Sequence, residues 1–487
     1  MKAPATLSAP LGNFLPDPRF WAGLLFLAGL YWLDLPYYDD HSARQAGTAT
    51  IARNFYKFGL NPLYPMSDIC GEHSPDYFAT EFPFLQTLSV PLYHLFGEQY
   101  WIGRLVNWTV SCLGLVCFAR IVDRIFDKPV GLYAMLGVVG SVTLMFMRKM
   151  MPDTFSLFLA VIGTYYLYRY LEEGRGRQLI LGGVIVTLGV LSKIPSLMVL
   201  TLLSTPFLFK TIPLRRKIRV FSVLLVAGCC TACWYFYWMG YLQDINRCPP
   251  LIFPVSLSEG FQTFFFEHWR NAYTRFTKIA FFGPWPFVLF LIGVVYSAWK
   301  RQWPLLLGAA AYTVLLLLFA FKTGHVFPTH NYYVIPYIPL MALFAAQLFH
   351  QRWLPWWGAL LIILAGIYEP VRKNGQDIYL RYDPLEVELN RLLDEAGSDP
   401  DAHIMINGRQ IDPTLMYYSK RKGWAITNET LEKYHWMPDY RAAGLKHLVV
   451  DRRRYDKPLR YRVAAENRLF RVYDVSVTLP EGKVKGE

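Results

Sequence analysis

Long apolar runs recur along the chain and constrain its fold more than any other feature. Between Phe20 and Tyr368, stretches of roughly 15–22 residues are dominated by apolar side chains, and about 20 such residues let a helix cross the hydrocarbon core of a membrane. The charged fraction of 17% is lower than a soluble domain carries. The sequence therefore predicts an all-α polytopic membrane protein. The runs fall near residues 20–35, 82–97, 102–122, 129–147, 153–171, 178–192, 195–210, 218–239, 279–298, 303–321, 327–348 and 353–368.

Positively charged loops between the runs predict which runs cross the membrane. Short loops rich in Lys and Arg are retained in the cytoplasm. The loops around Arg124, Arg175, Arg216 and Arg301 are each separated from the next by two runs, so they can all lie on that side. This arrangement accounts for the net charge of +13 better than nucleic-acid binding does, and we expect no nucleic-acid partner.

The run 82–97 does not fit an ordinary crossing. With Lys2 and Arg19 inside, the segment 36–101 must begin and end outside, so this short run, which contains Pro83 and Pro91, cannot span. We therefore predict about eleven transmembrane helices and an outer location for the C-terminus. The segments predicted to share the outer face are 36–101, 148–153, 240–278, 322–333 and the chain after residue 370.

The composition changes after Tyr368, and this divides the chain into a transmembrane domain, residues 1–369, and a second domain, residues 370–487. Short strand patterns at 403–406, 447–450 and 468–473 and helical patterns at 384–396 and 429–443 predict a small α/β domain. It has no phosphate-binding glycine loop and no nucleophile elbow, so we expect it to support or recognise rather than catalyse.

An acidic pair follows the first apolar run. Asp39 and Asp40 stand beside His41 and Arg44 in a short polar segment at the membrane surface, where charges are costly unless they are solvated or functional. A carboxylate is a suitable general base for an acceptor hydroxyl or amine. The alternative is a solvated helix end, and the choice between Asp39 and Asp40 as the base is open.

Several cations are predicted on the outer face, which the positive-inside rule depletes of Lys and Arg. A cluster of them could hold a phosphate leaving group, although any one could instead extend to lipid headgroups. The cations predicted to bind this phosphate are Arg44, Arg104, Arg148 and Lys193. His330, Tyr332 and Tyr333 are placed at the same face, either in the site or, for the tyrosines, as aromatic-belt anchors.

The cysteines show no metal-ligand spacing. Five of the seven, including Cys112 and Cys233, lie inside apolar runs and are interpreted as packing residues. Cys70 and Cys248 are placed in outer loops, and we expect a disulfide between them if those loops touch.

Several short motifs follow one another along residues 20–350. They are Asp39-Asp40-His41, His41-Ser-x-Arg-Gln45, Ile51-Ala-Arg-Asn-Phe55, Glu81-Phe-Pro83, Gly103-Arg-Leu105, Arg148-x4-Asp153, Leu191-Ser-Lys-Ile-Pro195 and His330-Asn-Tyr-Tyr333. In this order they resemble the motifs of bacterial membrane glycosyltransferases of the GT-C fold, in the superfamily of the protein O-mannosyltransferases and the lipid A aminoarabinose transferase. One departure is Gly47, where the bacterial branch often has an acidic residue, and this leaves the register of the catalytic acid between Asp39 and Asp40 open.

The resemblance implies a multi-pass protein of the bacterial inner membrane, surrounded by membrane lipids, that moves a sugar from polyprenyl (undecaprenyl) phosphate to an acceptor at the periplasmic face, with inversion. The C-terminal domain would be periplasmic, and no cofactor is expected. The alternative is a transporter or flippase of a lipid-linked glycan, which would place ionisable residues nearer mid-membrane. The residues implied for the substrate cavity are His41, Glu81, Asp153, His330, Tyr332 and Tyr333.

Overall fold

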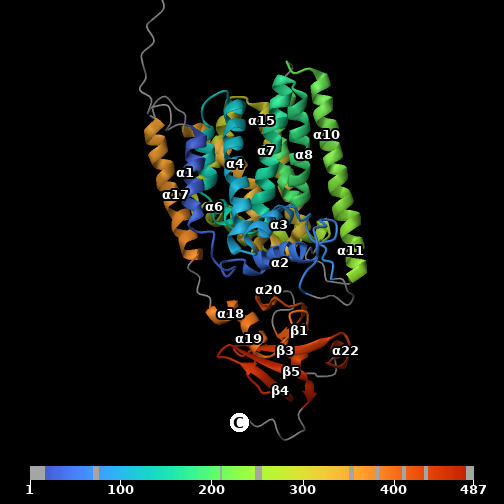
Figure 1. Ribbon diagram of the computed structural model, residues 1–487. Coiled ribbons are helices and arrows are strands. Elements are labelled where there is room, and N and C mark those ends of the chain that lie inside the picture. Colours follow the sequence, from blue (N-terminus) through green and yellow to red (C-terminus); the bar gives the residue numbers. More distant parts are fainter. Residues whose placement is uncertain are drawn as a thin grey trace, which may run out of the picture. The chain divides into compact units, whose positions relative to one another are not determined.

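The computed structural model of the chain describes residues 17–69, 76–208, 211–246, 255–349, 356–378, 383–407, 413–432 and 437–478. These residues form two units, each described by itself below (Figure 1). Unit 1 contains Met1–Asp34, Trp101–Tyr237 and Ile252–Ile378, and unit 2 contains Leu35–Tyr100, Trp238–Leu251 and Tyr379–Glu487. The predicted disulfide partners Cys70 and Cys248 lie outside the described residues.

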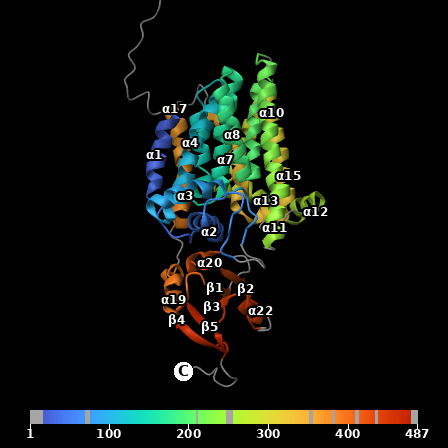
Figure 2. The same cartoon turned by 45° about the vertical axis from the view of Figure 1, so that its right-hand side comes forward.

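Unit 1 is helical. Figure 1 shows its long helices side by side, and the turned view in Figure 2 shows the same arrangement. Its α-helices are α1 (Pro18–Leu30), α4 (Tyr100–Phe126), α5 (Gly131–Val139), α6 (Thr143–Met147), α7 (Pro152–Glu173), α8 (Gly176–Ser192), α9 (Ser204–Leu208), α10 (Leu214–Ala232), α12 (Leu257–Gln262), α13 (Trp269–Thr274), α14 (Trp285–Trp299), α15 (Trp303–Thr323), α16 (Ile338–Ala346) and α17 (Trp356–Ile378). Its 3-10 helices are η2 (Ile194–Leu203), η6 (Gly324–Thr329), η7 (Asn331–Tyr337) and η8 (Gln347–Phe349), and its π-helical stretches are η3 (Cys233–Trp238), η4 (Thr263–Glu267) and η5 (Arg275–Ile279).

Helix α7 lies at the centre of unit 1. Its residues from Pro152 to Val161 are all buried, and so are most of those from Gly163 to Leu171, as expected for a helix that is surrounded by other helices. It packs closely against α8 because small residues face each other: a Cβ on Gly189 would come within 2.7 Å of the backbone nitrogen of Ala160. Helix α10, by contrast, exposes large apolar side chains such as Phe221. The two helices therefore represent an inner and an outer position in the bundle.

Several predicted runs fold differently from a single straight helix. The run 129–147 is two helices, α5 and α6, separated at Gly140. The run 195–210 begins as the 3-10 helix η2, which has Pro195 in its first turn. Helix α17 continues to Ile378, ten residues beyond the end of the predicted run 353–368.

Four helical stretches among the described residues are long and apolar enough to cross a membrane. They are Tyr100–Phe126, Leu214–Ile245, Trp303–Thr329 and Asn331–Phe349. The fold is thus that of a mainly helical membrane protein with a small C-terminal sheet, and the total of about eleven spans stays a prediction.

The run 82–97 forms the short helix α3 (Phe84–Phe96) of unit 2. Its 13 residues make a helix of about 20 Å, shorter than the roughly 30 Å hydrocarbon core of a bilayer. It packs against α2 (Ser42–Phe58). That the run 82–97 does not cross the membrane stays a prediction.

Unit 2 contains a five-stranded mixed sheet in the order β2-β1-β3-β5-β4. Strands β1, β2 and β3 are parallel, and β5 runs antiparallel to β3 and β4. The strands are β1 (His403–Asn407), β2 (Gly423–Ile426), β3 (Leu445–Asp451), β4 (Tyr461–Glu466) and β5 (Phe470–Thr478), and the remaining helices are α11 (Met239–Asn246), α18 (Pro384–Val387), α19 (Leu389–Glu395), α20 (Thr414–Ser419), α21 (Asn428–Glu432) and α22 (Met437–Ala442). The predicted α/β character of this part is confirmed, and β2 and β4 are additional strands.

Segment 35–100 is joined to this sheet within unit 2. Ile69 forms an isolated parallel bridge with Gly423, whose N–H donates to the carbonyl of Asp68 at 2.9 Å. The guanidinium of Arg53 on α2 donates to the carbonyl of Tyr417 on α20 at 2.9 Å. The change in composition at residues 369 and 370, which predicts the domain boundary, gives no sign of these contacts.

Candidate functional site

The acidic pair lies just before α2 in unit 2, and its two members have different environments. Asp39 is buried, and its carboxylate accepts a hydrogen bond from the amide of Gln45. The Asp40 side chain is 43% exposed, and its carboxylate lies 3.4 Å from Nε2 of His41. His41 has a left-handed backbone, with φ of 64°, immediately before the helix begins at Ser42. Asp40 is therefore the accessible carboxylate and Asp39 the one fixed to the helix.

Arg44 and Glu81, which the sequence assigns to phosphate binding and to the substrate cavity, form an ion pair with each other in unit 2. The hydroxyl of Thr80 donates to the second oxygen of the Glu81 carboxylate at 2.7 Å. Both charged side chains are mostly buried. The pair places one positive and one negative charge near the N-terminus of α2, so Arg44 does not act as an isolated cation.

Arg53 is the buried centre of a polar network in the same unit. Its guanidinium pairs with Asp68 and lies 3.5 Å from Glu98, and it stacks 4.3 Å from the centre of the Tyr417 ring. Burial alone would lower the pKa of Arg53, but the two carboxylates outweigh burial, and the pKa is raised. This network holds α2 to the C-terminal sheet and was not recognised in the sequence.

The turn between α6 and α7 in unit 1 carries two buried cations. Arg148 donates to the side chains of Asn374 at 2.7 Å and Asp377 at 2.5 Å, both on α17. Nζ of Lys149 lies 2.7 Å from the same Asp377 oxygen. One carboxylate thus faces two cations. Asn107 of α4 fixes the shape of the turn, because its amide donates to the carbonyl of Lys149 at 2.8 Å.

A second cluster in unit 1 joins the ends of α7, α8 and η7. Nζ of Lys193, at the end of α8, lies 2.6 Å from Oδ1 of Asp153, the second residue of α7. The same ammonium lies 5.0 Å from the centre of the Tyr332 ring and 5.9 Å from that of Tyr333, distances at which a cation is attracted to an aromatic face. The other carboxylate oxygen of Asp153, Oδ2, is buried and has no partner among the described residues.

His330 packs on this cluster. Its ring centre lies 5.1 Å from that of Tyr332, and its Nδ1 lies 3.1 Å from the carbonyl of Val326. Burial lowers the pKa of His330, and the positive charge of Lys193 lowers it further. His330 is consequently neutral at pH 7, which limits the positive charge in the cluster.

The two cation clusters of unit 1 are connected by an aromatic ring. Phe146 of α6 lies 5.8 Å from Tyr332, ring centre to ring centre, and the ammonium of Lys149 lies 5.6 Å from the Phe146 ring. Arg148, Lys149 and Lys193 therefore belong to one region. In that region Arg148 and Lys149 pair with Asp377, and Lys193 pairs with Asp153.

Arg104 lies on α4 and is completely buried in unit 1. Its guanidinium donates to the carbonyl of Leu33 at 3.2 Å, so it contacts the residues that follow α1. The neighbouring Gly103 packs against Met150, because a Cβ on this glycine would come within 2.4 Å of the Met150 sulfur. Helix α4 is therefore pressed against the turn that carries Arg148 and Lys149.

The predicted site residues are thus distributed over both units. Unit 2 brings together Asp39, Asp40, His41, Arg44 and Glu81, and unit 1 brings together Arg148, Asp153, Lys193, His330, Tyr332 and Tyr333, with Arg104 on the adjoining helix α4. Asn107, Asn374 and Asp377 also contact these groups and were not predicted from the sequence. The i, i+3 spacing of Asn374 and Asp377 on a helix was the available signal for the last two. The described residues contain no group of three His, Cys, Asp or Glu side chains that could hold a metal ion.

Comparison with known proteins supports a glycosyltransferase fold. A family model described as dolichyl-phosphate-mannose-protein mannosyltransferase matches residues 82–238. No curated protein sequence matches the chain significantly.

Among solved structures, the chain is similar to ArnT from Cupriavidus metallidurans in the apo state, with a TM-score of 0.58 and 13% identity over 97% of this chain and 100% of that chain. The same protein bound to undecaprenyl phosphate gives the same TM-score and identity over 98% of this chain and 100% of that chain. The oligosaccharyltransferase of Archaeoglobus fulgidus in the apo form gives 0.53 and 12% identity, over 91% of this chain and 70% of that chain. The GT-C fold expected from the sequence motifs is confirmed.

Proposed function

Starting from the GT-C fold that the chain shares with ArnT, we propose that it is an inverting, polyprenyl-phosphate-sugar-dependent glycosyltransferase of the bacterial inner membrane. The observation that carries the proposal is the gathering of three buried cations, Arg148, Lys149 and Lys193, in one region of unit 1. Fixed cations of this kind form charge-assisted hydrogen bonds with a phosphate group, such as that of a lipid phosphate. Undecaprenyl phosphate, the ligand of the ArnT structure, has this chemistry.

In the proposed reaction, Asp40 acts on the acceptor and the cations act on the donor. Asp40 removes a proton from an acceptor hydroxyl or amine as that atom attacks the anomeric carbon of the sugar. The bond between the anomeric carbon and the phosphate oxygen breaks, and polyprenyl phosphate leaves with the electron pair. Negative charge grows on the departing oxygen, and fixed cations stabilise it in the transition state.

The group around Lys193 suits the donor phosphate. Its ammonium is held by Asp153 and lies over the ring of Tyr332, so its position is fixed before a ligand arrives. Charged groups that are already oriented cost no reorganisation when charge develops. We assign Lys193 and Arg148 to the phosphate, and His330, Tyr332 and Tyr333 to the cavity around it. Arg44 and Arg104 belong to the proposed set on sequence grounds, with Arg44 acting as an ion pair with Glu81.

The test is a donor panel. The purified full-length protein in lipid nanodiscs is given polyprenyl phosphates that carry different sugars, and release of polyprenyl phosphate is measured together with the covalent sugar product. We expect one donor to be consumed, and Lys193→Gln to reduce the rate at least about 100-fold, as removal of one transition-state donor does. Thr109→Val is the matched control, because the Thr109 hydroxyl bonds only within α4. Movement of a lipid-linked glycan across the bilayer without a covalent product would contradict the proposal.

A further inference from the structure

Unit 2 contains a cavity of about 110 Å³ at the edge of its sheet. Its floor is formed by the carboxyl ends of the three parallel strands, through Ile406 of β1, Ala425 of β2 and Asp451 of β3. In the strand order β2-β1-β3, the chain passes from β1 to β2 on one side and then returns to β3 on the other. Ligands of open α/β sheets bind at this kind of reversal, outside the carboxyl ends of the strands.

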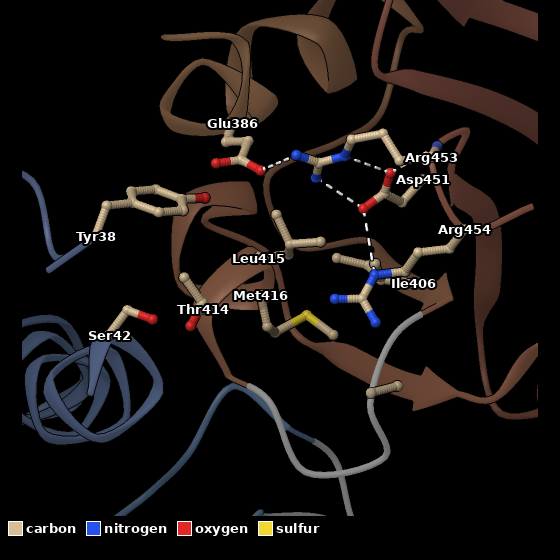
Figure 3. A pocket seen from close by; sticks show the side chains of 11 residues that line it. Tyr38, Ser42, Glu386, Ile406, Thr414, Leu415, Met416, Asp451, Arg453 and Arg454 are labelled. Carbon is tan, nitrogen blue, oxygen red and sulfur yellow. Dashed lines mark hydrogen bonds and ion pairs between the residues drawn. The ribbon is translucent and has the colours of Figure 1, made fainter. Parts of the chain in front are cut away.

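Segment 35–100 closes the cavity from the opposite side. Figure 3 shows Tyr38, Ser42 and Thr414 across the cavity from Asp451 and Arg454. Tyr38 stacks on Tyr418, with ring centres 5.0 Å apart, and burial together with the neighbouring Glu386 raises the pKa of its hydroxyl, which stays protonated. The cavity therefore offers three hydroxyl groups on one side.

Two consecutive arginines define its charge. Arg453 is fully engaged: it binds Asp451 through Nε at 2.9 Å and Nη2 at 2.8 Å, and Glu386 through Nη1 at 2.5 Å. Arg454 uses only Nε, 3.4 Å from Asp451, and its two terminal nitrogens have no partner among the described residues. Figure 3 shows this guanidinium directed toward Met416 in the cavity wall. Arg454 thus presents an open fork, the geometry that matches a carboxylate or a phosphate.

The charge balance distinguishes these two anions. Among the described lining residues, Arg453 and Arg454 offset Glu386 and Asp451, so the cavity is neutral when empty. A carboxylate adds one negative charge, which the open fork of Arg454 can pair. A phosphate monoester adds nearly two at pH 7, beside two buried carboxylates. The cavity is therefore suited to a monoanion that also carries hydroxyl groups.

The position of the cavity relates it to the acidic pair. Tyr38 and Ser42, which line it, flank Asp39, Asp40 and His41 in the sequence. A ligand seated there contacts the two residues between which the acidic pair stands in the sequence. We propose that this cavity binds the acceptor through a carboxylate-bearing sugar of the uronic acid type, with Arg454 as the anchor of the carboxylate. The role of the ligand as acceptor rests on the proposed function, whereas its binding does not.

The experiment measures binding without any donor. The full-length protein in nanodiscs is titrated with D-glucuronate, D-glucose and D-glucose 6-phosphate, and the dissociation constants are obtained from ligand-observed NMR. We expect glucuronate to bind at least tenfold more tightly than either of the other two sugars. Arg454→Gln should weaken glucuronate binding at least tenfold, and Arg454→Lys, which keeps the charge but not the fork, should weaken it less.

The matched control is Arg452→Gln. Arg452 belongs to the same run of arginines but pairs with Asp456 and does not line the cavity, so its loss should change the dissociation constant less than twofold. Thermal melting of each variant shows whether it is folded. Equal binding of glucuronate and glucose, binding of glucose 6-phosphate as tight as that of glucuronate, or an unchanged affinity in folded Arg454→Gln would each overturn the proposal. Because no donor is present, a negative result in the donor panel leaves this measurement unaffected.

Discussion

At the scale of the residue, the two neighbouring acids are distinguished by their surroundings and not by their chemistry. Asp39 is buried and accepts a hydrogen bond from Gln45, so its carboxylate is held in place at the start of α2. Asp40 is exposed and lies beside His41. A general base must reach the proton it removes, and Asp40 satisfies that condition better. The sequence alone left this choice open, because adjacent residues of the same type have the same local pattern.

We expect Asp40→Asn to reduce sugar transfer by about 100-fold or more, because it removes the base and preserves the shape of the side chain. Asp39→Asn is the matched variant, since its amide can still bond to Gln45, and it should retain most of the activity. The measurement is the initial rate with the donor identified in the panel. The opposite result, a loss in Asp39→Asn and none in Asp40→Asn, would reverse the assignment.

His330 should make the stability of the protein depend on pH. Its pKa is lowered in the folded state, so the unfolded chain binds more protons and stability falls as the pH drops below about 6.5. The variant His330→Gln lacks this titrating group, so it lacks the part of the pH dependence of stability that His330 contributes. Melting temperatures in detergent between about pH 5 and pH 7.5 should therefore decrease less on acidification in the variant than in the wild type.

The pKa of His447 is lowered as well, but His447 is present in both proteins, so the difference between their curves reports on His330 alone. Parallel curves for the two proteins would show that the protonation of His330 is not linked to folding.

At the scale of the element, the carboxylate of Asp377 joins α17 to the turn between α6 and α7. Asp377→Asn should destabilise the protein by about 3–5 kcal/mol, because it removes a buried carboxylate that pairs with two buried cations. Glu369→Gln on the same helix removes the exposed pair with Arg372 and should have little effect. Thermal unfolding of the two variants in the same detergent compares them directly. Equal melting temperatures would mean that Asp377 is not the partner of Arg148 and Lys149 in the membrane.

Element positions were largely predictable because hydropathy is a local property. The run 102–122 is found inside α4 and the run 153–171 inside α7. The positions at which an apolar run divides into two helices were not predictable in the same way. Gly140 ends α5 inside a continuous apolar run, and apolar composition does not distinguish a straight helix from two short ones.

The site was predictable in its residue types but not in its pairings. The acidic pair, Arg148 and Lys193 stood out because they are polar residues at the ends of apolar runs. Asp377, which pairs with Arg148, lies 229 residues later in the chain, beyond the last predicted apolar run. Pairings of this kind depend on how helices pack, which a single sequence does not record.

At the scale of the whole molecule, we predict that segment 36–101, the turn at 148–153, segment 322–333 and the domain after residue 370 are periplasmic. Single cysteines are introduced at Arg215, Lys300 and Asp399 into a protein whose seven native cysteines are replaced by alanine. A membrane-impermeant thiol reagent added to intact spheroplasts should label only the cysteine at position 399.

This prediction follows from the distribution of Lys and Arg, and it requires that α3 does not cross the membrane. Labelling at positions 215 and 300, with protection at position 399, would invert the topology. Permeabilised cells give the control, since all three positions should then react.

The association of segment 35–100 with the C-terminal sheet changes how deletion experiments must be designed. A chain ended at residue 369, where composition changes, would lose Asn374 and Asp377 and would leave Arg148 and Lys149 without their acid. A chain ended at residue 378 keeps that pairing but loses two other contacts. Arg53 no longer bonds to the carbonyl of Tyr417, and Ile69 no longer forms its bridge with Gly423. The loss of activity in such a truncated protein could then result from loss of structure in α2 and the acidic segment before it. It would not show whether the removed strands recognise a substrate. Point substitutions in the sheet are therefore the cleaner way to study this part of the protein.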